Sequence, residues 1–176
     1  MPSDTLTRPL DPKADLPAVE ALFHAAADYV ALETGLPVDG SQAADFLTGA
    51  PPGLDPASSL RLGVFDAAGQ VLLGGAEVAF GYPRAEDAYI GLMIFAPALR
   101  RGGHGRALLR RIEAEAVVRG ADRLLVAVLE ANTNGMGFWT AQGFALEKLV
   151  PDRQMGQHLH QVHRLAKPLR PAPVAG

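Results

Sequence analysis

Residues 87–120 read DAYIGLMIFAPALRRGGHGRALLRRIEAEAVVRG, and the architecture expected for the rest of the chain follows from this stretch. Residues 88–95 are almost wholly apolar, as in a strand covered on both faces. Pro97 is expected to end that strand because it has no N–H to donate. Apolar residues then recur at helical spacing, at Leu108, Leu109, Ile112 and Ala116. With Gly120 as its expected end, the stretch predicts a buried strand, a glycine-rich turn and an amphipathic helix.

The turn between the predicted strand and helix is basic and rich in glycine. Residues 100–106 read RRGGHGR, with three arginines and three glycines in seven positions. Such a turn before a helix presents free backbone N–H groups and the positive end of the helix dipole. A phosphate or pyrophosphate suits this arrangement. A solvated surface turn is the alternative interpretation, since turns use glycine freely.

Two other phosphate-binding motifs do not fit this turn. A Walker loop requires Gly-Lys-Ser or Gly-Lys-Thr, and residues 100–106 contain no lysine. A dinucleotide fingerprint requires a third glycine after Gly103 and Gly105, where Leu108 stands instead. Glu130 imitates the ribose-binding carboxylate of that motif, but the turn is too long for the tight crossover of such a fold. Neither motif is therefore assigned here.

Composition limits the classes of protein to which the chain can belong. It has 176 residues, 48% hydrophobic and 20% charged, as expected of one globular domain with a sizeable core. The absence of cysteine excludes disulfides, thiolate zinc sites and a cysteine nucleophile. A net charge of −3 argues against general nucleic-acid binding, and no signal peptide or membrane-spanning run is seen. We therefore expect a cytoplasmic protein with neither nucleic acid nor membrane as partner.

The other segments predict the remaining elements of one domain over residues 1–167, followed by a Pro-rich tail over 168–176. Helices are expected over 15–32 and 41–47, and strands over 5–9, 60–65, 71–80, 123–129, 146–150 and 157–165. The 123–129 strand should lie parallel to the 88–95 strand because a helix connects the two. Gly74 and Gly75 together predict a bulge or a close backbone approach.

A second motif follows the 123–129 strand, where residues 130–144 read EANTNGMGFWTAQGF. Asn132 or Asn134 is expected to cap a short helix that ends at Gly143. The chain resembles the GNAT N-acetyltransferase superfamily over about residues 60–149, in its pyrophosphate loop (Q/R-x-x-G-x-G/A) and its fourth helix. The residues that carry the resemblance are Arg100, Gly103 and Gly105 in the first motif and Asn132, Gly135, Phe138, Trp139, Gly143 and Phe144 in the second. The resemblance implies an α/β (α+β) fold with a mixed central sheet of about six to seven strands and about four helices.

The same resemblance implies acetyl-CoA as co-substrate, no metal, and direct transfer of an acetyl group to a primary amine of a small molecule or peptide. The pyrophosphate would be held by the amides of Arg101, Gly102, Gly103, His104, Gly105 and Arg106. Arg100 would order this loop, and Asn132 would contact the pantetheine arm. The backbone at Ile94 and Phe95 would align the pantetheine and polarise the thioester carbonyl.

The sequence departs from the family pattern at the catalytic positions. Trp139 stands where a tyrosine usually protonates the leaving thiolate, and an indole N–H cannot give up its proton at useful cost. Trp139 is expected either in the core or as a wall of the coenzyme slot. Leu92 and Met93 stand where many relatives have a glutamate. The candidates for the general base are Glu130 first, then Tyr89, Glu77 and His104, with a water relay as a further alternative.

The acceptor and the alternatives to catalysis stay open at this point. Asp28, Tyr29 and Glu33 are candidates to bind a cationic amine, and a homodimer is expected only by analogy with the superfamily. A non-catalytic acyl-CoA-binding sensor on the same fold is an alternative, because the usual tyrosine and strand glutamate are missing. An RNA-binding protein would need exposed stacking aromatics beside residues 100–106.

Three histidines near the C-terminus, His158, His160 and His163, superficially resemble a metal-binding tract. On a strand, the first two share a face and the third points the other way. Zinc normally needs three or four convergent ligands. We therefore expect these residues to be solvated or hydrogen-bonded strand histidines.

Overall fold

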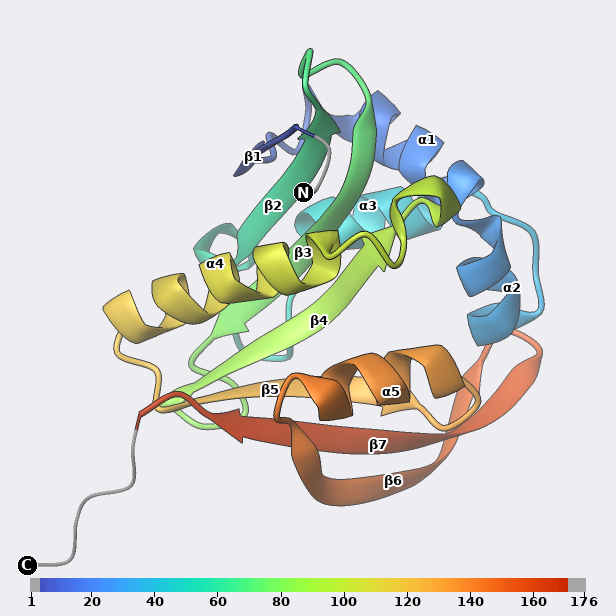
Figure 1. Ribbon diagram of the computed structural model, residues 1–176. Helices are drawn as coiled ribbons and strands as arrows, with labels where there is room; N and C mark the ends of the chain where they lie inside the picture. The colour runs from blue at the N-terminus through green and yellow to red at the C-terminus, as the bar shows by residue number, and fades with distance from the viewer. Residues whose placement is uncertain (1–3, 171–176) are drawn as a thin grey trace, which may run out of the picture.

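The computed structural model describes residues 4–170, which form a mixed seven-stranded sheet with helices on both faces (Figure 1). The strand order is β1-β2-β3-β4-β5-β7-β6. The strands span Thr5–Pro9 (β1), Leu60–Asp66 (β2), Leu72–Phe80 (β3), Asp87–Phe95 (β4), Arg123–Leu129 (β5), Ala145–Met155 (β6) and His158–Pro168 (β7). The β4–β5 pair is parallel, and the other five neighbouring pairs are antiparallel. The expected mixed α/β architecture is confirmed.

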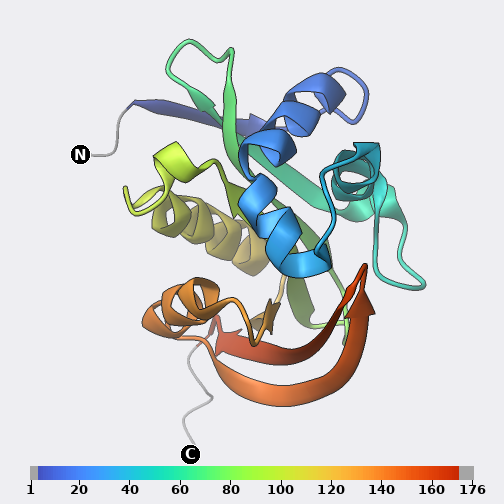
Figure 2. The same ribbon diagram turned by 90° about the vertical axis from the view of Figure 1, so that its right-hand side faces the viewer.

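Two layers of helices cover the sheet, as Figure 2 shows from the side. The helices span Leu16–Ala25 (α1), Ala27–Thr34 (α2), Gly40–Thr48 (α3), His104–Val118 (α4) and Thr133–Ala141 (α5). Helices α4 and α5 bury Leu108, Ile112 and Trp139 in one apolar cluster. Helices α1–α3 bury Val30 and Phe46 in a second cluster. The apolar spacing of each helix thus faces one side of the sheet.

The prediction of one helix over residues 15–32 is wrong, and this accounts for five helices where about four were expected. The helix breaks at Ala26, whose φ of −99° and ψ of 31° leave the helical region. Ala26 and Val30 are both fully buried, so the apolar spacing continues through the break. The sequence therefore carries no sign of the change in direction that separates α1 from α2.

A β-bulge at Gly91 changes which side chains of β4 face each layer. Glu77 of β3 pairs with Leu92, whereas Val78 pairs with Ile90, so Gly91 is an extra residue in β4. Before the bulge, Ile90 belongs to the cluster under α4 and α5. After it, Leu92 packs against the cluster under α1–α3. The bulge thereby reverses the alternation expected of a regular strand.

The paired glycines of β3 behave as predicted. Val64 of β2 pairs with Gly74, whereas Phe65 pairs with Leu72, so β3 carries a bulge immediately before Gly74. The Phe95 ring lies directly over Gly74, where a side chain would overlap it. Both a bulge and a close approach are therefore present.

Strands β4 and β5 are paired at one end and separated at the other. Their parallel register, predicted from the helical crossover, runs from Asp87–Arg123 to Ile90–Val126 and goes no further. Beyond it, β4 continues to Phe95 and β5 to Leu129 without pairing to each other. We call the Asp87–Arg123 end the closed end of this strand pair and the other the open end.

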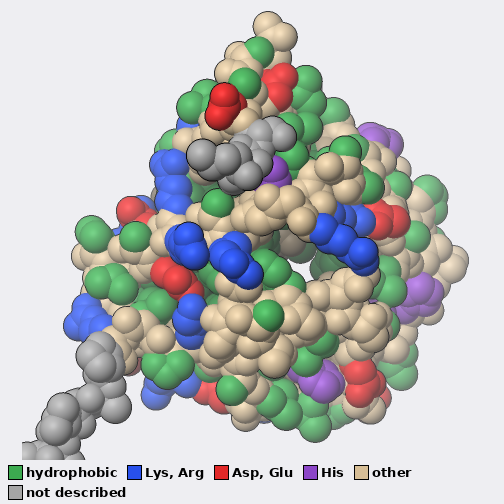
Figure 3. Space-filling model, in the orientation of Figure 1, with side chains coloured by type: hydrophobic (Ala, Val, Ile, Leu, Met, Phe, Trp, Pro, Cys, Tyr) green, Lys and Arg blue, Asp and Glu red, His purple; other side chains and the backbone are tan. Residues whose placement is uncertain are grey.

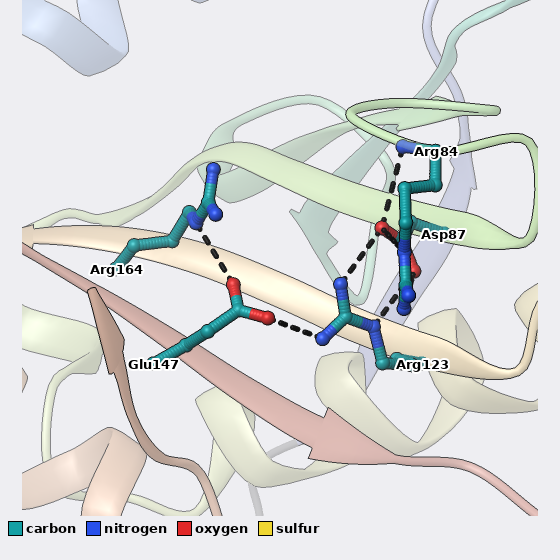
Figure 4. A network of polar contacts seen from close by, with 5 residues as sticks. All are labelled: Arg84, Asp87, Arg123, Glu147 and Arg164. Carbon is teal, nitrogen blue, oxygen red and sulfur yellow. Dashed lines mark hydrogen bonds and ion pairs between the residues drawn. The ribbon is translucent and has the colours of Figure 1, made fainter.

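An ion-pair network fastens the closed end (Figure 4). The Asp87 carboxylate is buried and accepts two hydrogen bonds from Arg123, at 2.8 and 2.9 Å, and further ones from Arg84. Arg123 also bonds Glu147 of β6, which accepts from Arg164 of β7 at 2.9 Å. Burial alone would raise the pKa of Asp87, but the two arginines outweigh it and hold that pKa at about 2. Four strands are therefore joined at this point.

The C-terminal strands are longer than predicted. The segments expected over 146–150 and 157–165 are present in β6 and β7, which form a hairpin of 11 residues on each side. Pro168, the first residue of the expected tail, ends β7, and the Leu169 amide donates to the Asp122 carbonyl at 2.8 Å. Residues 171–176 of that tail lie outside the described residues. Nowhere in residues 4–170 is a helix long and apolar enough to cross a membrane.

Candidate active site

The glycine-rich loop lies at the open end of β4 and leads into α4. Arg101 and Gly103 have positive φ, at 64° and 83°, which turns the chain sharply between Pro97–Leu99 and the helix. Gly103 caps α4 without a side-chain bond. Within residues 4–170, the backbone N–H groups of residues 101–106 have no hydrogen-bond acceptor. Six consecutive unpaired amides at a helix N-terminus form an arrangement suited to an anion.

Arg100 is the residue that fixes this loop in place. Its Nε donates to the Phe95 carbonyl at 3.0 Å, and its guanidinium forms a two-pronged pair with Asp28 of α2, at 2.5 and 2.9 Å. The hydrogen bond from Arg100 lowers the pKa of Asp28. Asp28, a sequence candidate for amine binding, is therefore engaged by the loop.

The backbone of β4 borders the gap at the open end. The Ala96 amide donates to Leu73 of β3, and antiparallel alternation therefore turns the Ile94 amide toward β3 as well. The amides of Met93 and Phe95 face the gap instead. Of the two positions predicted from sequence, Phe95 thus presents its N–H to the gap and Ile94 does not. Figure 3 shows a hollow here, between the start of α4 and α5, with Lys and Arg side chains beside it.

Asn132 and Trp139, which the sequence places among the candidates for the coenzyme site, both make structural contacts at α5. Asn132 caps the helix, accepting from the Gly135 amide at 2.9 Å, as one of the two expected caps. Trp139 is only 7% exposed and packs edge-to-face against Phe138 and Phe144, with 5.0 Å between ring centroids in each pair. This places its ring in the core, one of its two expected positions. A side chain at Gly105 would come within 3.3 Å of the Phe138 ring, so glycine keeps α4 and α5 close.

A pocket of about 430 Å³ opens on the other face of β4, under α1–α3. We call it the acidic pocket. Its lining residues are Phe23, Glu33, Thr34, Ser41, Gln42, Asp45, Phe46, Gly49, Ala50, Pro51, Glu77, Tyr89, Gly91 and Leu92. Three of them are carboxylates, and none is basic.

Glu77 is the most unusual of these residues. Its Oε1 is buried and has no hydrogen-bond partner among the described residues, and burial raises the pKa of this carboxyl. The carboxylate rests against Gly91, where any side chain would collide with it. Burial likewise raises the pKa values of Glu33 and of Tyr89. The bulge at Gly91 therefore makes room for an unpaired carboxylate beside β4.

The four candidates for the general base are not brought together. Tyr89 and Glu77 line the acidic pocket. Glu130 does not, and its 60% exposed side chain lies 3.6 Å from His163. His104 is buried at the first turn of α4 and is also absent from the lining. From the sequence, Glu77 is only one of three candidates placed after Glu130. A glycine in the middle of β4 was the available signal.

Two of the three C-terminal histidines contact backbone carbonyls, whereas His163 lies beside Glu130. His158 and His160 lie 3.0 and 2.7 Å from the Leu32 and Glu33 carbonyls at the end of α2. They are hydrogen-bonded strand histidines, as expected. Among residues 4–170, no group of three or more potential metal ligands is found.

Comparison with known proteins identifies the family. The model of the Acetyltransferase (GNAT) family matches residues 20–144, which is more than half of the chain. The chain therefore belongs to the GNAT acetyltransferase family, whose members are acyltransferases that use acetyl-CoA. No curated protein matches the sequence.

Solved structures share this fold over almost the whole chain. An acetyltransferase from Thermus thermophilus is 25% identical with a TM-score of 0.72, over 95% of this chain and 98% of that one. A GCN5-related N-acetyltransferase from Kribbella flavida is 26% identical with a TM-score of 0.68, over 93% and 97%. A putative acetyltransferase from Salmonella typhimurium, solved with its cofactor acetyl-CoA, is 18% identical with a TM-score of 0.66, over 97% and 96%. Because the Salmonella typhimurium protein is only 18% identical, its similarity to this chain shows a shared fold and nothing more.

Proposed function

We propose that this chain transfers an acetyl group from acetyl-CoA directly to a primary amine. The observation that carries the proposal is the meeting of two features at the open end of β4. Unpaired amides of residues 101–106 and the gap between β4 and β5 lie at this end. The acidic pocket lies against the same segment of β4, through Gly91 and Leu92. Coenzyme and acceptor can thus approach one strand from two sides.

The loop amides would hold the pyrophosphate, and the β4 backbone would bind the pantetheine arm. The amides of residues 101–106 supply hydrogen-bond donors together with the positive end of the α4 dipole. The N–H groups of Met93 and Phe95 face the gap, where one can donate to the thioester oxygen as negative charge develops on it. Arg100 contributes by holding the loop against Asp28 and Phe95.

Glu77 is the general base in this proposal. Its partly buried carboxylate, whose pKa is raised by desolvation, accepts a proton from the acceptor ammonium, directly or through one water. The freed nitrogen lone pair forms the new C–N bond and the thioester C–S bond breaks. The nitrogen then loses its second proton to water as the neutral amide forms. The CoA sulfur leaves as a thiolate, which is stable enough near neutral pH to need no dedicated acid. Trp139, held in the core, takes no part in proton transfer.

Calorimetric titration with acetyl-CoA, with NAD as a control ligand, tests the binding half of the proposal. Wild type is expected to bind acetyl-CoA with micromolar Kd and not to bind NAD. Gly103→Asp places a carboxylate in the anion site and is expected to abolish binding. Gly103→Asn is the matched control, because it imposes the same positive φ of 83° on a side chain of the same shape without the charge.

Mass-spectrometric detection of acetylated amine tests the catalytic half. Acetyl-CoA binding with no transfer to any amine would contradict a transferase and favour the acyl-CoA sensor. Absence of acetyl-CoA binding by the wild type would contradict both, and the loop of residues 100–106 would then be an ordinary basic turn.

A further inference from the structure

We infer that the acceptor is a diamine or longer polyamine that carries no carboxylate or phosphate, bound in the acidic pocket. The inference rests on the proposed function and adds the chemical class of the substrate. Three independent features of the pocket point to it: the charge of its lining, the engagement of two nearby cations, and its apolar walls.

The lining carries three carboxylates and no basic side chain. Its three carboxylates are Glu33 at the end of α2, Asp45 on α3 and Glu77 on β3. No ion pair to any of the three is found within residues 4–170. Glu77 in addition has a buried oxygen, Oε1, with no hydrogen-bond partner in the described part of the chain. Unpaired carboxylates in a partly desolvated pocket favour a cationic ligand, which supplies the missing partner.

Two of the cations near the pocket, Arg61 and Arg100, are bonded to other groups. Arg61, whose charge acts on Glu77, donates to the carbonyls of Phe46, Pro56 and Gly49, at 2.8, 2.9 and 2.5 Å. Arg100 is paired with Asp28. A carboxylate or phosphate on the acceptor would therefore meet three like charges in the lining and no basic side chain among the lining residues. This disfavours amino acids and phosphorylated amines as acceptors.

The distribution of the carboxylates fits two amino groups joined by a methylene chain. Glu77 lies beside Gly91 and Leu92 on β4, where transfer takes place in this proposal. Glu33 and Asp45 come from the helical layer that covers the sheet. Phe23, Phe46 and Leu92 give the pocket apolar walls. One ammonium is then deprotonated by Glu77, while the second is held by Glu33 and Asp45.

Three amines with the same five-carbon chain separate the alternatives. 1,5-Diaminopentane has two amino groups, L-lysine adds one carboxylate to it, and pentan-1-amine lacks the second amino group. We expect kcat/KM for 1,5-diaminopentane to exceed that for each of the other two by about tenfold or more. One additional charge-assisted hydrogen bond, or the avoidance of one like-charge repulsion, accounts for a difference of this size. Direct calorimetric binding of the same three amines is expected to rank them in the same order.

A variant at Glu33, a lining carboxylate from the helical layer, tests which residue holds the second amino group. Glu33→Gln is expected to raise KM for 1,5-diaminopentane about tenfold with little change in kcat, and to leave pentan-1-amine unaffected. Glu86→Gln, which changes an exposed glutamate outside the pocket, is expected to leave all three amines unaffected.

Failure of this inference is distinguishable from failure of the proposed function. If the chain acetylates L-lysine as well as or better than 1,5-diaminopentane, the substrate class is wrong and the transferase stands. If it binds acetyl-CoA and transfers to no amine, binding of 1,5-diaminopentane still decides: weaker binding than L-lysine, or none, overturns the inference. If acetyl-CoA does not bind at all, the proposed function fails and this inference fails with it.

Discussion

Each end of the β4–β5 pair has a carboxylate beside it, the fully buried Asp87 at the closed end and the partly buried Glu77 of β3 at the open end, and the two are in opposite situations. At the closed end, Asp87 accepts hydrogen bonds from Arg123 and Arg84, and its pKa is held at about 2. At the open end, Glu77 has an oxygen with no partner among the described residues, and burial raises its pKa. A satisfied buried charge joins strands, whereas an unsatisfied one costs stability and is tolerated where a ligand completes it. We therefore propose a structural role for Asp87 and a catalytic role for Glu77.

The largest expected effect on stability is at the closed end. Asp87→Asn leaves Arg123 without its charged partner in a network that joins β4, β5, β6 and β7, so we expect the free energy of unfolding to fall by roughly 3 kcal/mol. Urea unfolding followed by circular dichroism measures it. Asp122→Asn, which changes a half-exposed aspartate 3.6 Å from Arg170, is the control, with an expected change within about 0.5 kcal/mol. Equal effects of the two substitutions would contradict a special role for the buried network.

A smaller effect of opposite sign is expected at the open end. Because burial raises the pKa of Glu77, the folded chain disfavours its ionised form. Glu77→Gln is therefore expected to raise the free energy of unfolding at pH 8 by about 1 kcal/mol, the value of a modest pKa shift. The same unfolding experiment measures it, and a large loss of stability would mean that Glu77 is a structural residue.

The contributions of Asp87 and Glu77 to the free energy of unfolding also depend on pH in opposite ways. The stabilising contribution of Asp87 is present above its ordinary pKa of 3.8 and is lost as the pH falls toward about 2. Glu77 behaves in the opposite sense: its raised pKa gives stability below its ordinary value of 4.5, and this is lost as the pH rises through the folded value. The gain from Glu77→Gln should accordingly disappear between pH 8 and pH 4. A gain that stays constant over that range would show that it does not come from ionisation.

The smallest expected effect concerns the loop. Asp28→Asn weakens an exposed pair, so the free energy of unfolding should change by less than about 1 kcal/mol. Because the pair holds Arg100 and the loop against α2, the Kd for acetyl-CoA is expected to rise about threefold in a calorimetric titration. Glu115→Gln, which removes another exposed ion pair but lies away from the loop, should not change that Kd.

Much of the fold was predictable from the sequence because its strongest patterns are local. The apolar run of β4, the helical spacing of α4 and the crossover to β5 together predict the parallel pair at the centre of the sheet. The break at Ala26 was not predictable, because buried residues at helical spacing lie on both sides of it. Only packing over the sheet shows that α1 and α2 are separate helices.

The candidate site likewise has one part that was predictable from the sequence and one part that was not. The proposed anion-binding half follows from residues 100–106, whose composition and position before a helix are visible in the sequence. The acidic pocket does not, because Glu77 and Leu92 are brought side by side by a register shift at Gly91 that no local pattern encodes. The favoured position of Glu130, at the end of β5, resulted from sequence adjacency to the presumed coenzyme site, whereas its side chain lies with His163.

The comparison of the two ends is tested most directly by the kcat/KM of two glutamine variants for acetyl transfer to 1,5-diaminopentane. The account predicts that Glu77→Gln lowers kcat/KM about 100-fold or more, as loss of a general base does. It predicts that Glu130→Gln stays within about threefold of wild type, since its exposed carboxylate lies outside the acidic pocket. Full activity of Glu77→Gln together with a large loss in Glu130→Gln would contradict the account and return the general base to the end of β5.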